Sequence, residues 1–197
     1  MLDARVRRRL LPALDPVAAT LDARGVRAWH ATAVGLGMGV AACIAAGLAA
    51  WPTALVLWLG NRALDGLDGA LARRQGATDL GGFLDFVADF VVYGGFVVGV
   101  AVAVPDSRVA CCALLAAYLL NNVAQLTFAS LVEKRGLGYG DERSIRLTPG
   151  LTEGTETIVA YTAFCVLPTH AEIVAWTFAA MVLFTAGQRI ALARRAL

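Results

Sequence analysis

Charged residues are scarce in this sequence of 197 residues: they make up 16% of it, whereas 58% of the residues are hydrophobic. A soluble domain has roughly 25% charged and roughly 45–50% apolar residues. The apolar residues fall in long blocks that use nearly the whole chain. This composition excludes an ordinary soluble enzyme and indicates a single membrane domain.

Histidines and paired cysteines are also scarce. The two histidines, His30 and His170, fall at opposite ends of apolar blocks, so they do not form a metal-binding pair. None of the four cysteines has C-x-x-C spacing, and all lie inside apolar blocks (Cys43, Cys111, Cys112 and Cys165). We therefore interpret the cysteines as small apolar side chains and expect neither a zinc site nor disulfides.

The apolar blocks are long enough to cross a membrane, which requires about 20 mostly apolar residues. Three Pro-containing pairs, Trp51-Pro52, Pro105-Asp106 and Pro168-Thr169, predict tight turns, while 74–80 and 133–150 form longer connections. We therefore predict an all-α integral membrane protein with six transmembrane helices, at about 29–50, 52–74, 81–104, 107–132, 151–168 and 171–192.

Basic residues predict the orientation. The three short turns contribute only Arg108, whereas fourteen arginines and lysines flank the opposite ends of the spans. By the positive-inside rule, both termini and the longer loops face the cytoplasm. The alanine- and arginine-rich composition agrees with a bacterial inner membrane. The residues that support this orientation are Arg5, Arg7, Arg8, Arg9, Arg24, Arg27, Arg73, Arg74, Lys134, Arg135, Arg143, Arg146, Arg194 and Arg195.

The first 28 residues contain no continuous apolar core. Apolar residues recur instead at steps of four and three, with arginines and aspartates between them, which predicts an amphipathic helix lying in the cytoplasmic interface. Pro12 and Pro16 are expected to kink or divide it. We therefore expect an interfacial helix within 1–28 and a six-helix membrane domain over 29–197. The apolar stripe consists of Leu2, Val6, Leu10, Leu14, Val17 and Leu21.

Four aspartates lie inside the second and third spans, where ionisable side chains are costly and indicate function. Asp65 and Asp68 are three residues apart and Asp85 and Asp89 four apart, so each pair shares a helix face. Asp68 lies about 7.5 Å before Arg73 along the helix, at 1.5 Å per residue. Since the third span runs antiparallel to the second, the four carboxylates are expected to converge near the cytoplasmic surface.

Such a cluster requires cations or protons to relieve its repulsion. Carboxylates without His or Cys favour Mg²⁺ or Mn²⁺. Two such ions roughly 3.5–4 Å apart would stabilise the attacking and leaving oxygens of a phosphoryl displacement. Small residues nearby, Gly69, Ala72 and Gly81, leave a slot for a flat base and its phosphates.

The run Asp65-x-x-Asp68-Gly69-x-x-Ala72-Arg73, followed by Gly81-x-x-x-Asp85-x-x-x-Asp89, resembles the signature of the CDP-alcohol phosphatidyltransferases. All eight signature residues are present over about 25 residues. Seven residues separate Arg73 from Gly81, where the usual pattern has eight, and the difference falls in the cytoplasmic turn.

The resemblance implies a role for each matching residue. Asp65, Asp68, Asp85 and Asp89 would bind two Mg²⁺ or Mn²⁺ ions, and Asp89 would also be the catalytic base. The donor would be CDP-diacylglycerol, with CMP as the leaving group. Membrane lipid would surround a homodimer, for which Gly95-x-x-x-Gly99 is a possible packing motif, and we expect no nucleic-acid partner. The cytidine diphosphate pocket would consist of Asp65, Gly69, Ala72, Arg73 and Gly81.

The acceptor alcohol is less clearly indicated. The resemblance favours glycerol 3-phosphate, whose phosphate would be bound by basic groups. Inositol phosphate, serine, choline and phosphatidylglycerol are the alternatives, and the acidic residues at the start of the fifth span suit a polyol or a cationic acceptor. The candidate acceptor-binding residues are Glu153, Glu156, Lys134, Arg135, Arg143, Arg146 and Arg189.

Two further interpretations stay open from the sequence. Arg62 lies one turn before Asp65, too deep for an arginine that only reaches the interface, and either pairs with an acidic residue or lines the pyrophosphate site. A different class of function, a cation transporter, would use the same aspartates for translocation. Transporter sites usually lie at the membrane midplane between inverted repeats, and no repeat is apparent here.

Overall fold

The computed structural model describes residues 2–136 and 151–197, with side chains described from residue 12 onward. Within these ranges the fold is all-α. The helices are α1 (Leu2–Ala23), α2 (Ala28–Gly47), α3 (Trp51–Gln75), α4 (Asp79–Ala103), α5 (Arg108–Lys134), α6 (Gly154–Val166) and α7 (Ala171–Ala196), with 3-10 turns η1 (Pro105–Ser107) and η2 (Pro168–His170).

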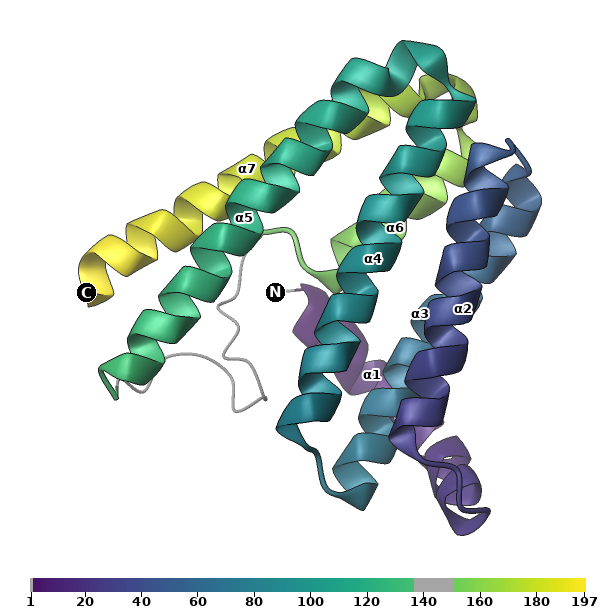
Figure 1. The fold of residues 1–197 in the computed structure, drawn as a ribbon, viewed down its shortest axis with the longest axis vertical. Helices are drawn as coiled ribbons and strands as arrows, with labels where there is room; N and C mark the ends of the chain where they lie inside the picture. The colour runs from purple at the N-terminus through teal and green to yellow at the C-terminus, as the bar shows by residue number, and fades with distance from the viewer. Residues whose placement is uncertain (1, 137–150) are drawn as a thin grey trace.

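Two groups of helices make up the molecule. Helices α2, α3 and α4 lie side by side, and α5 pairs with α7 along most of its length (Figure 1). The short helix α6 lies between the groups and contacts both α3 and α7. The three Pro-containing turns fall where the sequence predicts them, because Pro52 lies in the first turn of α3 and Pro105 and Pro168 begin the two 3-10 turns.

Four segments are long and apolar enough to cross a membrane: α2, α4, η1 with α5, and η2 with α7. Helix α3 has the length but contains Arg62, Asp65 and Asp68, which lower its hydropathy. Helix α6 has only 13 residues and begins at Gly154, three residues later than the sequence predicts. The chain is therefore an all-α integral membrane protein, with four helices that meet both criteria.

The residues that precede α6 bond to α7. The backbone N–H of Leu151 donates to Gln188 at 3.1 Å, and that of Thr152 donates to the Thr185 hydroxyl at 2.9 Å. Side chains of α7 thus satisfy N–H groups that have no partner within α6. The backbone of Glu153 is extended, and α6 therefore begins only at Gly154.

The packed centre is aromatic. Trp58 of α3, Phe96 of α4, and Tyr161 and Phe164 of α6 are completely buried. The Tyr161 ring centroid lies 4.8 Å from that of Trp58 and 5.0 Å from that of Phe96. Aromatic rings at such distances stabilise one another beyond the area that they bury, and here they fix α3, α4 and α6 at one level.

Small residues set the distance between α2 and α4. A Cβ added at Gly99 would lie 2.5 Å from the Cys43 carbonyl oxygen, and one at Gly39 would lie 2.3 Å from Val92. Because lipid supplies no hydrophobic force between helices, such close backbone approach is the main source of helix association. The first of the Gly95-x-x-x-Gly99 pair faces Cys43 as well, so both glycines of the motif pack inside the protomer.

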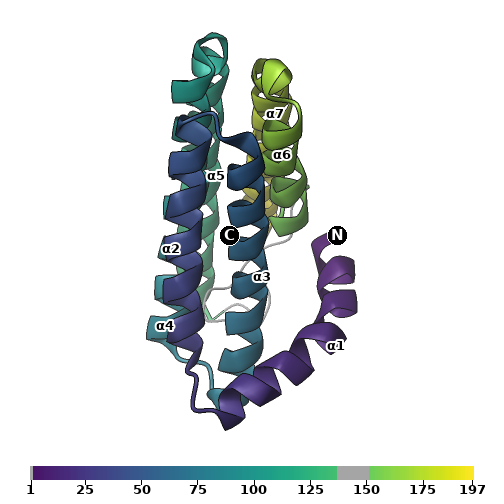
Figure 2. The ribbon, with the colours of Figure 1, turned by 90° about the vertical axis from the view of Figure 1, so that its right-hand side faces the viewer.

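Helix α1 runs across the end of α3 and bends along its length (Figure 2), with Pro12 and Pro16 inside it. Ala18 is completely buried in a small cluster with Ala70 and Leu71 of α3, and Leu14 packs beside them. Part of the apolar stripe predicted from the sequence therefore contacts protein. Of the two expected effects of Pro12 and Pro16, the structure shows a bend, and α1 continues through both prolines as one helix.

Candidate active site

The site lies where α2, α3 and α4 meet, near the end of α3 that carries Arg73 and Arg74. Helix α3 ends at Gln75, and Gly76, with φ of 89°, reverses the chain. Thr78 then caps α4: its hydroxyl accepts from the backbone N–H of Gly81 at 3.1 Å. This short connection places the aspartates of α4 opposite those of α3.

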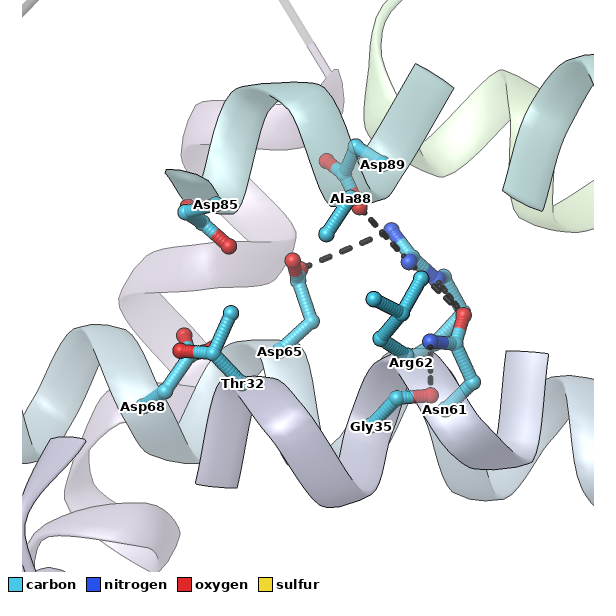
Figure 3. A pocket seen from close by; sticks show the side chains of 10 residues that line it. Thr32, Gly35, Asn61, Arg62, Asp65, Asp68, Asp85, Ala88 and Asp89 are labelled. Carbon is cyan, nitrogen blue, oxygen red and sulfur yellow. Dashed lines mark hydrogen bonds and ion pairs between the residues drawn. The ribbon is translucent and has the colours of Figure 1, made fainter. Parts of the chain in front are cut away.

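The structure brings three of the predicted metal ligands together. Asp65 and Asp68 of α3 and Asp85 of α4 each offer a carboxylate oxygen, and these oxygens lie within 4.8 Å of one another (Figure 3). Oxygens on opposite sides of an octahedral Mg²⁺ are about 4.2 Å apart, twice the usual bond length of about 2.1 Å. The three carboxylates therefore fit one hard divalent ion after a shift of a few tenths of an ångström.

Asp68 is the most buried of the three, with 5% of its surface exposed. The hydroxyl of Thr32, on α2, donates to Asp68 Oδ2 at 2.8 Å. Partners of this kind orient a carboxylate toward a metal and strengthen its binding. Thr32 was not predicted from the sequence, because only the packing of α2 on α3 brings the two residues together.

Asp89 lies deeper and makes different contacts. Its Oδ1 forms an ion pair with Arg62 Nη2 at 2.7 Å, and its Oδ2 accepts from the Tyr93 hydroxyl at 3.4 Å. Arg62 Nη1 also lies 3.6 Å from Asp65 Oδ2. Of the two roles left open for Arg62 by the sequence, the structure shows pairing with acidic residues. Tyr93, one turn after Asp89, was predictable in principle from its i+4 spacing.

One pocket holds this arrangement. Gly69, Ala72, Arg73 and Gly81, predicted to bind cytidine diphosphate, are not among its lining residues; they lie nearer the exposed end of α3 and the start of α4. The Arg73 guanidinium lies across Gly69, where an added Cβ would be 3.4 Å from Nη1. The pocket is lined by Thr32, Gly35, Leu36, Asn61, Arg62, Asp65, Asp68, Asp85, Ala88 and Asp89.

The residues predicted to bind the acceptor are dispersed. The Glu156 carboxylate accepts from the backbone N–H of Glu153 at 3.0 Å, so this glutamate stabilises the start of α6. Arg135 donates to the Leu197 carbonyl at 2.6 Å, and Lys134 is exposed at the end of α5. Arg143 and Arg146 lie outside the described residues.

Arg189 is the acceptor candidate that the structure holds inside the bundle. It is 9% exposed, and its Nη1 donates to Asn121 Oδ1 at 2.7 Å, which joins α7 to α5. Its charge also interacts with that of Glu153 at the start of α6. Arg189 therefore places a buried positive charge between α5 and α7, close to the start of α6.

Fold and site together define a class: a helical membrane protein with a carboxylate centre at one end of its spans, suited to a divalent ion and a phosphorylated substrate. The family model of the CDP-alcohol phosphatidyltransferases matches residues 30–187. The chain belongs to this family and is a CDP-alcohol phosphatidyltransferase.

Comparison with individual proteins agrees. The chain is 38% identical over 194 residues to the Inner membrane protein YnjF of Escherichia coli (strain K12), an alignment that covers 96% of this chain and 94% of that protein.

Among solved structures, the fold is similar to that of Mycobacterium tuberculosis phosphatidylinositol phosphate synthase (PgsA1). With CDP-DAG bound, that protein superposes with a TM-score of 0.72 and 21% identity, covering 91% of this chain and 92% of that chain. In complex with manganese and citrate, it superposes with a TM-score of 0.73 and 23% identity, covering 92% of this chain and 88% of that chain. At these identities the comparison shows a shared fold.

Proposed function

We propose that this enzyme transfers the phosphatidyl group of CDP-diacylglycerol to glycerol 3-phosphate and releases CMP. The observation that carries the proposal is the convergence of Asp65, Asp68 and Asp85 within 4.8 Å, with Asp89 one turn beyond Asp85 on the same helix face. The Mycobacterium tuberculosis synthase of similar fold has been solved with CDP-DAG bound and, separately, in complex with manganese and citrate, which supports this donor and a divalent ion.

In this proposal Asp65, Asp68 and Asp85 hold Mg²⁺ or Mn²⁺, and Asp89 joins them when the donor is bound, so that the complete complex contains two ions. Bound divalent ions would neutralise the pyrophosphate and the departing phosphate. Gly69, Ala72, Arg73 and Gly81, with Asp65, would form the cytidine diphosphate pocket, since Arg73 already lies across Gly69.

Asp89 is the proposed general base. It accepts the proton of the acceptor hydroxyl, whose oxygen attacks the phosphorus that bears the diacylglycerol. The bond from this phosphorus to the bridging oxygen breaks, and CMP leaves with the bonding electrons. The acceptor hydroxyl must therefore approach from the side of α4, which carries Asp89.

Arg189 is the proposed anchor of the acceptor phosphate, because it is a buried cation between α5 and α7 whose position is fixed by its bond to Asn121. Glu153, Glu156, Lys134 and Arg135 contribute less directly in this proposal, since the glutamates cap α6 and Arg135 bonds to the chain end. Arg143 and Arg146 would complete the site from the 133–150 connection.

The membrane arrangement proposed from the sequence keeps six spans within 29–197, with both termini cytoplasmic in a bacterial inner membrane and residues 1–28 in the interface. Helix α3 crosses in this arrangement because its charged groups face α2 and α4. Helix α6 crosses within the bundle, where protein covers Tyr161 and Phe164. We also propose a homodimer, which light scattering of the detergent-solubilised protein would test.

The function is tested by measuring CMP release from CDP-diacylglycerol with one acceptor per reaction: glycerol 3-phosphate, inositol phosphate, serine, choline or phosphatidylglycerol. Stimulation by glycerol 3-phosphate alone, with phosphatidylglycerol phosphate as the product, is the expected result. Stimulation by another acceptor keeps the reaction but replaces the acceptor, and no stimulation by any of them contradicts the proposal.

A further inference from the structure

Arg62 occupies the space between two of the four aspartates. Its side chain is 8% exposed, and its guanidinium lies between α3 and α4 (Figure 3). Nη2 is 2.7 Å from Asp89 Oδ1, and Nη1 is 3.6 Å from Asp65 Oδ2. The guanidinium thus faces one carboxylate from each helix of the site.

Neutral groups hold the guanidinium in this place. Asn61 Oδ1 accepts from Nε at 2.9 Å and from Nη2 at 2.7 Å, and the Asn61 amide itself donates to the Gly35 carbonyl at 2.9 Å. Nη1 donates to the Tyr93 hydroxyl at 2.8 Å. The rings of Trp58 and Tyr93 lie 5.0 Å and 5.1 Å from Cζ, within cation–π distance. Neutral partners and aromatic rings therefore hold Arg62 beside the aspartates in the donor-free protein.

A divalent ion bound to both Asp65 and Asp89 would need the same space. Such an ion lies about 2.1 Å from each ligand oxygen, and the guanidinium already stands between these two carboxylates. Arginine keeps its charge at any pH at which the protein is folded. By contrast, the oxygens of Asp65, Asp68 and Asp85 lie within 4.8 Å of one another, and Asp68 accepts from a neutral group, the Thr32 hydroxyl.

Charge balance also favours a single divalent ion while the donor is absent. Four carboxylates carry four negative charges, and one divalent ion with Arg62 neutralises three of them. A second divalent ion would turn this small excess of negative charge into an excess of positive charge, in a site of low polarity where an unbalanced charge is costly. The donor pyrophosphate carries two negative charges, so it restores the balance when it arrives together with the second ion.

We propose that Arg62 is a positioning residue that occupies the second cation position while the donor is absent. The free protein then binds one divalent ion, at Asp65, Asp68 and Asp85, and takes up the second only with the donor pyrophosphate. The pyrophosphate gives the guanidinium another anionic partner, so that Asp89 is released for the second ion and the acceptor proton. This inference rests on the donor and the metal centre of the proposed function.

The test counts Mn²⁺ ions bound to the detergent-solubilised protein, from the electron paramagnetic resonance signal of free Mn²⁺. We expect one ion per chain for the wild type, two for Arg62→Gln and one for Arg62→Lys, which keeps the charge. Arg74→Gln is the matched control, because Arg74 lies on the same helix but pairs with Asp15 at 3.3 Å, outside the pocket. It is expected to bind one ion.

A second titration contains CDP-diacylglycerol without an acceptor, and protein-free micelles with the same lipid give the background. The wild type is expected to gain one ion, and Arg62→Gln none. Two ions on the free wild type, or one ion on a folded Arg62→Gln, would overturn the inference. If Arg62→Gln fails to fold, the number of Mn²⁺ ions on the wild type still tests the inference, which requires one ion without the donor and two with it.

These counts are separable from the proposed function. They are made without acceptor and without turnover, so an error in the acceptor would leave them unchanged. Absence of any bound Mn²⁺ on the wild type would instead contradict the metal centre itself, and with it both proposals.

Discussion

The hydroxyl of Thr32 donates a hydrogen bond of 2.8 Å to Asp68 Oδ2, and this contact ties α2 to the most buried aspartate of the site. A carboxylate that binds a metal through one oxygen is oriented by the partner of the other. The first apolar helix of the domain thus takes part in the proposed metal centre, although it contributes no acidic residue to it.

Thr32→Val should therefore weaken metal binding. The substitution keeps the shape of the side chain but removes its donor, and such outer partners are worth about 10–100-fold in metal affinity. We expect Mn²⁺ affinity to fall about tenfold, measured by titration of the purified protein. Thr32→Ser, which keeps the hydroxyl, should bind as the wild type does; an unchanged affinity in Thr32→Val would show that the contact does not orient Asp68.

Gly99→Ala should destabilise the bundle, because the new Cβ would lie 2.5 Å from a backbone oxygen, at Cys43, that cannot move independently of α2. Overpacking of this kind costs about 1–3 kcal/mol. Thermal unfolding in detergent should show a Tm roughly 3–10 °C lower. Gly94→Ala is the control, since nothing lies within 4 Å of its added Cβ. Equal Tm values for the two variants would mean that α2 and α4 are not in close contact.

Arg189→Gln should raise the KM for glycerol 3-phosphate and leave the KM for CDP-diacylglycerol unchanged. A hydrogen bond to a charged group contributes about 1.5–3 kcal/mol, which corresponds to a rise of roughly tenfold or more. Steady-state kinetics with each substrate varied separately measures this. Arg195→Gln, an exposed arginine in the last turn of the same helix, is the matched control. A parallel rise in both KM values would indicate a structural effect of the Asn121 bond.

Green fluorescent protein fused to the C-terminus should be fluorescent in a bacterial host, because the arrangement of arginines and lysines predicts a cytoplasmic C-terminus. A fusion of alkaline phosphatase at the same place should be inactive. An active phosphatase fusion with a dark fluorescent one would reverse the orientation, and would place the carboxylate site on the other side of the membrane.

The sequence predicted the helices and the acidic centre well, for physical reasons. Asp65 and Asp68, and Asp85 and Asp89, are close in the chain, so helical spacing alone assigns each pair to one face. The Pro-containing turns likewise depend only on residues that are neighbours in the chain. The expected convergence of the aspartates was confirmed for Asp65, Asp68 and Asp85.

Other features depended on how separate helices pack. Thr32 and Gly35 are invisible to spacing arguments because their partners, Asp68 and Asn61, lie on another helix. The start of α6 was placed three residues too early because the helix is capped at Glu153, and hydrophobic spacing does not reveal the extended backbone of that residue. The alternative of a cation transporter is also disfavoured by position, since Asp68 lies in the last third of α3, near Arg73 and Arg74.

Phosphatidyl transfer itself is measured by CMP release from CDP-diacylglycerol by the purified protein, with glycerol 3-phosphate and Mn²⁺. We compare the wild type, Asp89→Asn and the control Asp106→Asn, whose aspartate lies in η1, outside the pocket. We expect CMP release by the wild type and Asp106→Asn, and a rate at least about a hundredfold lower in Asp89→Asn. Release should require Mn²⁺ and stop when EDTA is added. Release that persists with EDTA, or an Asp89→Asn variant as active as the wild type, would contradict it.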